Sequence, residues 1–303
     1  MLKILVLLYI SVMLVPFQAY SATSVSEILD KISSYDDTST RIEKASELLI
    51  GGQYASGPLG EGADGEYDQF PLYRLDVFDC TTFVETVMAF AISKTNLEFH
   101  DNLLRIRYRD GVISFASRNH FPSLDWIPNN EWLLFDLTEK VAGLGTRLGS
   151  GVINKSGWYK KLSRGRIRLK RYSDETDGEY KNRVSDALEK VRMLGEGFEP
   201  ELALIPYVSW DALYSSTTLS KIPHGAVISV VRPGWNLFKF LKIDIGTNIN
   251  ISHQGIAIWK DGVLYFRHSS SKSKKVVDSD FLEYMRIYIN SPTATGLNIL
   301  KVH

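Results

Sequence analysis

The sequence predicts an α+β protein, because one stretch has the pattern of a buried helix and others have the pattern of strands. Residues 80–91 (CTTFVETVMAFA) are apolar on nearly every side, which is typical of a helix in the middle of a fold. Residues 251–259 and 263–268 have a β-type composition and flank Lys260-Asp261-Gly262, which predicts a β-hairpin. We therefore expect helices and strands to share one core.

The chain begins with a segment typical of a secretory signal peptide. A charged start at Lys3 precedes an apolar run over 4–17 and the small-x-small sequence Ala19-Tyr20-Ser21, which predicts cleavage after Ser21. The apolar run is shorter than the ~20 residues that a membrane span requires. We predict a signal peptide over 1–21 and a mature chain, in the periplasm or outside the cell, that has no stable membrane span.

Hydrophobic spacing predicts the remaining elements. Residues 24–50 have the spacing of two short helices that end at Gly51-Gly52. The segments 104–117, 222–231 and 297–302 have the pattern of strands.

A basic segment lies in the middle of the chain. Seven Lys or Arg residues fall between Lys160 and Arg171, within a region of helical spacing. We predict a single domain over 22–303 with a helical, basic insertion around 131–220, packed beside the core and solvated. Contact with a glycan strand is the alternative interpretation of the basic run.

Overall charge gives no reason to expect a nucleic-acid partner. The chain has 35 basic and 35 acidic residues, so it has no net field to attract a polyanion. Its single cysteine, Cys80, cannot form an intramolecular disulfide in an oxidising compartment.

Cys80 begins the predicted buried helix, with Asp79 placed to cap it. A free thiol ionises near pH ~8.5, and the positive end of a helix favours the thiolate. The first-turn amides are also available to an oxyanion. A small buried apolar residue is the alternative, but the position favours a nucleophile held as an anion.

His253 begins the strand-like run 253–259, which would hold its imidazole on a rigid element. Its spacing of 15 residues from His268, across the predicted turn, places both side chains on one face of the hairpin. We predict that His253 is the base and that His268 orients it. The alternatives are structural histidines or two ligands of a metal site; no HExxH or CxxC spacing accompanies them, so we predict no metal and no cofactor.

Several motifs resemble a known superfamily, the NlpC-type papain-like murein hydrolases. They are Tyr54, Asp79-Cys80-Thr81-Thr82-Phe83-Val84-Glu85, His253-Gln254-Gly255-Ile256-Ala257-Ile258 and Phe266-Arg267-His268-Ser269-Ser270. In that superfamily Asp-Cys-Ser-x-Phe-Val lies on a helix, His-x-Gly-Ile lies on a strand, and another His follows on the next strand. The segments 115–121, 124–127 and 222–228 resemble its N-acetylmuramoyl-L-alanine amidase-like branch, and the resemblance covers about residues 45–303.

The resemblance implies a papain-like (NlpC-type) fold in which the helix that carries Cys80 packs on an antiparallel sheet. It implies a Cys80, His253 and His268 triad that forms a thioester, with Tyr54 beside the nucleophile as a hydrogen-bond donor. The residues that it places along the substrate cleft are Arg118, Asn119, His120 and Trp126. Without the resemblance, Trp126 is as well explained as a core residue and Arg118 as a surface ion pair.

The sequence departs from the superfamily pattern in places. Thr81-Thr82 replaces the usual Ser-Gly, and His224 stands where an acidic residue is common. These departures leave the three expected catalytic residues in place and concern the choice of substrate.

The resemblance implies hydrolysis of an amide bond in peptidoglycan, with peptidoglycan or muropeptide fragments as partners. The bond is that between N-acetylmuramic acid and L-alanine, or that between D-glutamate and the diamino acid of the stem peptide. A catalytically silent wall-binding module and a secreted toxin against a competitor's wall are further hypotheses.

Overall fold

The computed structural model describes residues 24–235 and 245–303, so the predicted signal peptide over 1–21 lies outside the described residues. The helices are α1 (Val25–Ile32), α2 (Thr38–Leu48), α3 (Cys80–Ala91), α4 (Asn96–Arg107), α5 (Ile127–Asn129), α6 (Thr138–Ala142), α7 (Lys155–Lys160), α8 (Asp177–Met193), α9 (Trp210–Leu213), α10 (Ser216–Leu219) and α11 (Phe281–Ile289), with short turns η1 (Arg109–Gly111), η2 (Pro122–Trp126), η3 (Gly143–Gly145) and η4 (Arg164–Arg166). The strands are β1 (Gln53–Tyr54), β2 (Val77–Phe78), β3 (Leu134–Asp136), β4 (Thr146–Ile153), β5 (Glu201–Ser209), β6 (Val227–Trp235), β7 (Ile249–Lys260), β8 (Val263–Ser270), β9 (Lys275–Asp280) and β10 (Gly296–Val302).

The described strands form one sheet in the order β2-β1-β9-β8-β7-β6-β10-β5-β4, with β3 paired to β10. All pairs are antiparallel except β1 with β2. The fold is therefore α+β with a mostly antiparallel sheet, as the sequence predicts.

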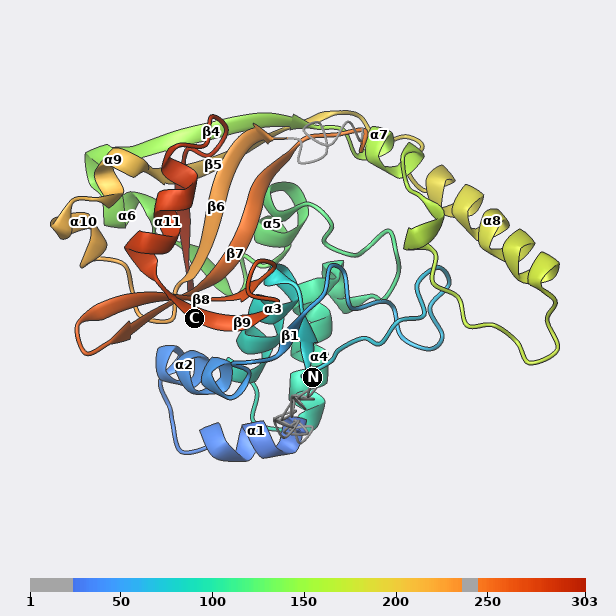
Figure 1. Cartoon of the computed structure of the whole chain (residues 1–303), viewed down its shortest axis with the longest axis horizontal. Coiled ribbons are helices and arrows are strands. Elements are labelled where there is room, and N and C mark those ends of the chain that lie inside the picture. The colour runs from blue at the N-terminus through green and yellow to red at the C-terminus, as the bar shows by residue number, and fades with distance from the viewer. Residues whose placement is uncertain (1–23, 236–244) are drawn as a thin grey trace, which may run out of the picture.

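The two faces of the sheet are covered by different helices (Figure 1). Ile256 and Ile258 of β7 pack in one apolar cluster with α1, α2, α3 and α4. Ala257, the residue between them, packs in a second cluster with Phe281 and Met285 of α11. This alternation is the two-residue period of a strand, and it explains why β7 is buried on both sides.

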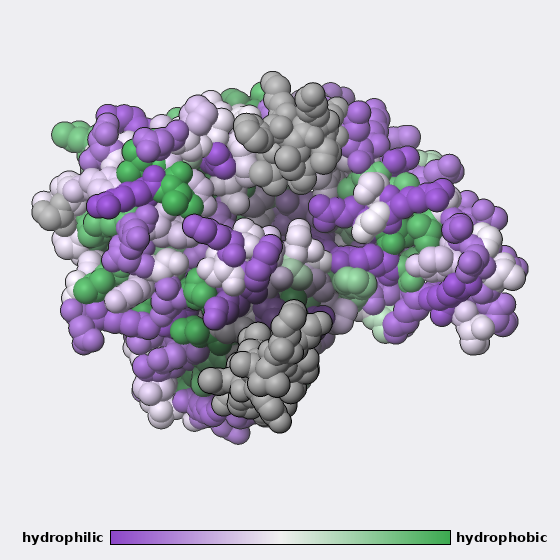
Figure 2. All heavy atoms as spheres, viewed as in Figure 1, coloured by the Kyte–Doolittle hydropathy of each residue, from purple (hydrophilic) through white to green (hydrophobic). Residues whose placement is uncertain are grey.

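The range 131–220 is less helical than the sequence predicts. It contains β4 and β5, which pair along their whole length and extend the main sheet, so the helical assignment is wrong for these residues. Its helix α8 lies away from the sheet (Figure 1) and packs on α7 through a separate apolar cluster that includes Tyr159, Leu188 and Val191. Most of the surface in this part of the molecule is hydrophilic (Figure 2).

The strand predicted over 104–117 is also wrong. Thr95 caps α4 by accepting the Glu98 amide, and the helix continues to Arg107. The buried residues of this helix, Phe99, Leu103 and Ile106, have helical spacing. Their packing in the core keeps residues 104–107 in the helix, although the sequence of 104–117 alternates as in a strand. The two N-terminal helices, the central helix, the hairpin and the closing strand are confirmed.

Candidate active site

Cys80 is the first residue of α3, because Asp79 and Thr82 form a reciprocal cap before it. The Thr82 amide donates to Asp79 Oδ1 at 2.8 Å, and the Asp79 amide donates to Thr82 Oγ1 at 2.9 Å. The other carboxylate oxygen of Asp79 accepts the Gly57 amide at 3.1 Å. Thr82, one of the departures from the superfamily pattern, thus completes a capping box.

The sulfur of Cys80 lies against β7. Thr81 Oγ1 is 4.0 Å from it, and the backbone amide of Gln254 is close enough to lower the pKa of the thiol. The Thr81 hydroxyl in turn donates to Gln254 Oε1 at 2.9 Å. The start of α3 is therefore joined to the residue that follows His253.

The predicted anionic state of Cys80 is wrong for this structure. Burial raises the pKa of the thiol to about 11, and the neighbouring Asp79 raises it further; the hydrogen bonds from Gln254 and Thr81 act in the opposite direction and are weaker. The cap that was expected to favour a thiolate brings its own negative charge close to the sulfur. The surroundings of Cys80 therefore favour the neutral thiol.

The two histidines meet on the β7–β8 hairpin. Its turn has positive φ at Asp261 (49°) and Gly262 (78°), as a two-residue type I′ turn requires. The ladder pairs Ile256 with Arg267, which places His268 diagonal to His253 and on the same face. His253 Nε2 is 2.8 Å from His268 Nδ1, and His268 Nε2 is 3.2 Å from Ser279 Oγ.

Both imidazoles are neutral at ordinary pH. Burial, with a smaller contribution from His268, lowers the pKa of His253 to about 3. Burial lowers the pKa of His268 to about 4 although Asp278 opposes it. With Nε2 of His253 engaged by His268, Nδ1 is the His253 nitrogen left to exchange a proton with a thiol or a substrate.

Two tyrosines border this cluster. The pKa of Tyr54 is raised by burial, then by the charges of Cys80 and Asp79; its role as a hydrogen-bond donor to the site stays a prediction. The Tyr284 ring lies 4.4 Å from the His268 ring and 6.0 Å from the His253 ring, and Cys80 contributes to its raised pKa after burial and Tyr288. Sequence reasoning missed Tyr284, which lies on the apolar helix α11 with no motif around it.

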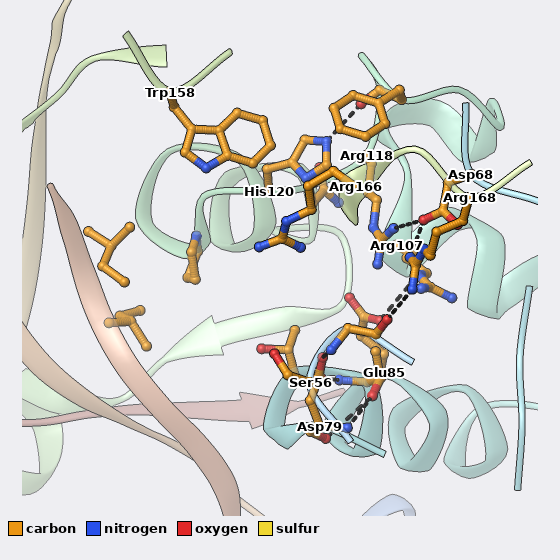
Figure 3. A pocket seen from close by; sticks show the side chains of 18 residues that line it. Ser56, Asp68, Asp79, Glu85, Arg107, Arg118, His120, Trp158, Arg166 and Arg168 are labelled. Carbon is orange, nitrogen blue, oxygen red and sulfur yellow. Dashed lines mark hydrogen bonds and ion pairs between the residues drawn. The ribbon is translucent and has the colours of Figure 1, made fainter. Parts of the chain in front are cut away.

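A pocket of about 320 Å³ opens beside the start of α3 (Figure 3). Asp79 and Thr81, the two neighbours of Cys80, are part of its lining. The full lining is Ser56, Gly57, Asp68, Asp79, Thr81, Thr82, Glu85, Arg107, Phe115, Arg118, Asn119, His120, Pro122, Trp158, Arg166, Arg168, Ile249 and Ile251. The pocket contains three of the four residues that the resemblance places in the cleft.

These three residues have different surroundings. Arg118 lies 3.5 Å from Asp68, and Asn119 donates to the Ile106 carbonyl at 3.0 Å. His120 Nε2 is 2.8 Å from the Phe115 carbonyl, and burial followed by Arg118 lowers its pKa to about 3.

Trp126 does not line the pocket. It is 0% exposed and packs in the core with α3 and α4, so its expected place in the cleft is wrong. Its Nε1 donates to Glu85 Oε1 at 3.1 Å, and Arg107 lies 3.7 Å from the same carboxylate. Trp126 therefore supports the floor of the pocket from behind.

Sequence reasoning also missed Arg107, Arg166 and Arg168 as pocket residues. The only sequence signal for two of them is the basic run 160–171, which predicts a solvated surface equally well. Within the described residues, there is no group of three or more His, Cys, Asp or Glu side chains that could hold a metal ion. None of the helices in the described parts of the chain is long and apolar enough to cross a membrane.

The arrangement defines a class of site: a thiol at the start of a buried helix, beside two hydrogen-bonded histidines and an arginine-lined pocket. The family model described as AmiA-like, N-acetylmuramoyl-L-alanine amidase-like, matches residues 44–289. The chain therefore belongs to this amidase-like family, and peptidoglycan is the substrate class of such amidases.

Solved structures agree with the family. A Legionella pneumophila protein of family DUF1460 is 35% identical, with a TM-score of 0.85 over 93% of this chain and 94% of that chain. An N-acetylmuramoyl-L-alanine amidase from Bacteroides uniformis is 22% identical, with a TM-score of 0.60 over 88% of this chain and 99% of that chain, and it supports the fold alone. Among curated proteins, no sequence matches this chain.

Proposed function

We propose that this chain is a secreted cysteine amidase with a papain-like (NlpC-type) core that cleaves the bond between N-acetylmuramic acid and L-alanine in peptidoglycan or its fragments. One observation carries the proposal. Thr81, the residue after Cys80, donates to Gln254, the residue after His253, at 2.9 Å, and His253 Nε2 lies 2.8 Å from His268 Nδ1.

The chemistry follows from the neutral state of both partners. His253 Nδ1 takes the thiol proton as Cys80 Sγ attacks the lactyl carbonyl carbon, which becomes tetrahedral with a negative oxygen. Amides at the start of α3 are suited to hold that oxygen because the helix leaves them without an internal acceptor.

The intermediate collapses when His253 returns its proton to the L-alanine nitrogen. The carbon–nitrogen bond breaks, the peptide leaves with a free amino group, and the muramyl group remains on sulfur as a thioester. Water, deprotonated by His253, then hydrolyses the thioester to a carboxylic acid and restores the thiol. His268 orients the imidazole throughout.

The test is digestion of purified peptidoglycan and muropeptides by wild type, Cys80→Ala and Cys80→Ser. We expect wild type to release muramyl species with a free lactyl carboxylate, and both variants to lose about 10⁴-fold or more in turnover. Because Cys80 is the only cysteine, one equivalent of iodoacetamide should give a single mass shift and the same loss.

Other fragments would point to other functions. Muramyl species that still carry L-alanyl-D-glutamate, with release of a peptide that begins at the diamino acid, would replace the amidase by an endopeptidase. Undiminished activity in Cys80→Ala would exclude cysteine catalysis, and fragments from neither bond would favour a wall-binding module. N-terminal sequencing of the exported protein tests cleavage after Ser21.

A further inference from the structure

Four arginines form one wall of the pocket, and they come from distant parts of the chain. Arg107 ends α4, Arg118 lies in the loop before η2, and Arg166 and Arg168 lie in and after η4. Figure 3 shows them across the pocket from Ser56 and Asp79. Four positive charges thus face three acidic side chains in the lining, those of Asp68, Asp79 and Glu85.

The acidic residues are already engaged. Asp68 pairs with both Arg118 and Arg168, Glu85 lies 3.7 Å from Arg107, and Asp79 caps α3. The four arginines therefore outnumber the three carboxylates of the lining, and one positive charge is left in excess.

Donor groups in this wall are left without partners. Arg107 is 1% exposed, yet its Nη2 is buried with no hydrogen-bond partner, and the same is true of Arg168 Nε. A buried donor without a partner destabilises a protein, so such groups are uncommon unless a ligand satisfies them.

Arg166 adds an exposed guanidinium at the mouth. Among the described residues no side chain forms a hydrogen bond or ion pair with it. Its Nη1 lies close to Gly57: a Cβ added to that glycine would be 3.7 Å from this nitrogen. Gly57 is in turn bound to Asp79, next to Cys80. The unpaired charge therefore lies close to the start of the catalytic helix.

An arginine fork matches a carboxylate, because two parallel N–H groups meet two oxygens. In the substrate of the proposed function, the residue after L-alanine is D-glutamate, joined through its side chain and carrying a free α-carboxylate in the acid form. One residue spans about 3.5 Å, so this group lies within a few ångströms of the amide that reacts. A pocket of about 320 Å³ accommodates one such residue.

We propose that the arginine pocket binds the free carboxylate of this second residue, so that the enzyme selects stem peptides carrying D-isoglutamate over those carrying its amide, D-isoglutamine. Arg166 contacts the carboxylate at the mouth of the pocket. The unpaired N–H groups of Arg107 and Arg168 lie deeper in the pocket and add to its positive potential. The inference rests on the proposed function for its substrate, and it concerns recognition and not the chemical step.

The experiment compares two ligands that differ in one group: N-acetylmuramoyl-L-alanyl-D-isoglutamate and its D-isoglutamine counterpart. Binding to Cys80→Ala protein is measured by calorimetry, and kcat/KM is measured with active enzyme. Arg166→Gln is the test variant. Arg164→Gln is the matched control, because Arg164 lies in the same turn η4 but donates to Ser185 Oγ away from the pocket.

We expect the acid to be preferred about 10- to 100-fold, as a charge-assisted pair predicts. Arg166→Gln should reduce this preference to about 3-fold or less, mainly through KM, with the melting temperature unchanged. Arg164→Gln should keep it. Competition by inorganic phosphate at the Arg166-dependent site, with no preference between the peptides, would assign the pocket to a phosphate ligand and overturn the proposal.

The two proposals fail separately. Equal binding and cleavage of acid and amide by wild type would overturn the carboxylate pocket and leave the amidase standing. Cleavage of neither ligand, with binding that still favours the acid and depends on Arg166, would overturn the amidase and support the pocket.

Discussion

The two sides of the candidate site are built in opposite ways. The side with Cys80, His253 and His268 comes from a helix and a hairpin, and its reacting groups are neutral. Three of the four arginines on the other side come from loops and from the turn η4, with Arg107 at the end of α4, and this side has more charge than its acids neutralise. The difference suggests that regular elements fix the chemistry and that irregular segments choose the substrate.

The largest effect is expected from disrupting the neutral side. In His268→Asn, the imidazole of His253 loses its partner at 2.8 Å, so its orientation loses support. We expect kcat to fall about 100- to 1000-fold, by analogy with the loss of an orienting group in a triad.

The loss of kcat in His268→Asn should leave substrate binding by the arginine side unchanged. Steady-state kinetics and the preference for acid over amide substrates measure the two sides independently. A His268→Asn enzyme with unchanged kcat would show that the pair of histidines is structural.

A smaller effect is expected where the two sides are joined. Trp126→Phe removes the indole N–H that donates to Glu85, and Glu85 is also the partner of Arg107. We expect unfolding free energy to fall by about 1–3 kcal/mol, because a buried carboxylate oxygen loses its donor. Urea denaturation measures this change, and an unchanged midpoint would mean that water replaces the indole without cost.

A further effect, spread over a range of conditions, is expected from pH. His268 has a folded pKa of about 4, below the ordinary value of 6.5, so between these values the unfolded chain binds a proton that the folded chain does not. Stability from this residue is therefore complete above pH 6.5 and falls on acidification, by up to about 1.4 kcal/mol per pH unit.

His120 and His253 act in the same direction, since burial lowers both their pKa values to about 3. Denaturant titrations at pH 7, 6 and 5 should show this slope, and His268→Asn should reduce it. Equal stability at pH 7 and pH 5 would indicate that these histidines are charged in the folded protein.

The sequence predicted the neutral side well because its signals are local. An apolar run with a cap locates α3, and Asp261-Gly262 between two β-type runs locates the hairpin. The protonation state of Cys80 was missed, since burial is a property of the folded chain.

The charged side was predicted poorly because its residues meet only after folding. Arg118 and Arg168 share Asp68 although they lie far apart in sequence, and a basic run does not reveal which of its members turn inward. Tyr284 has no motif, and Trp126 illustrates that an aromatic residue near a cleft motif can belong to the core.

The carboxylate of Asp79 has a further consequence. One oxygen starts α3 and the other holds Gly57, so the helix that carries the thiol and the loop at the mouth of the pocket share a single anchor. A ligand that displaces the loop would also shift the sulfur relative to β7. Under the proposed function, a peptide seated at the mouth of the pocket would therefore also bear on the position of the thiol.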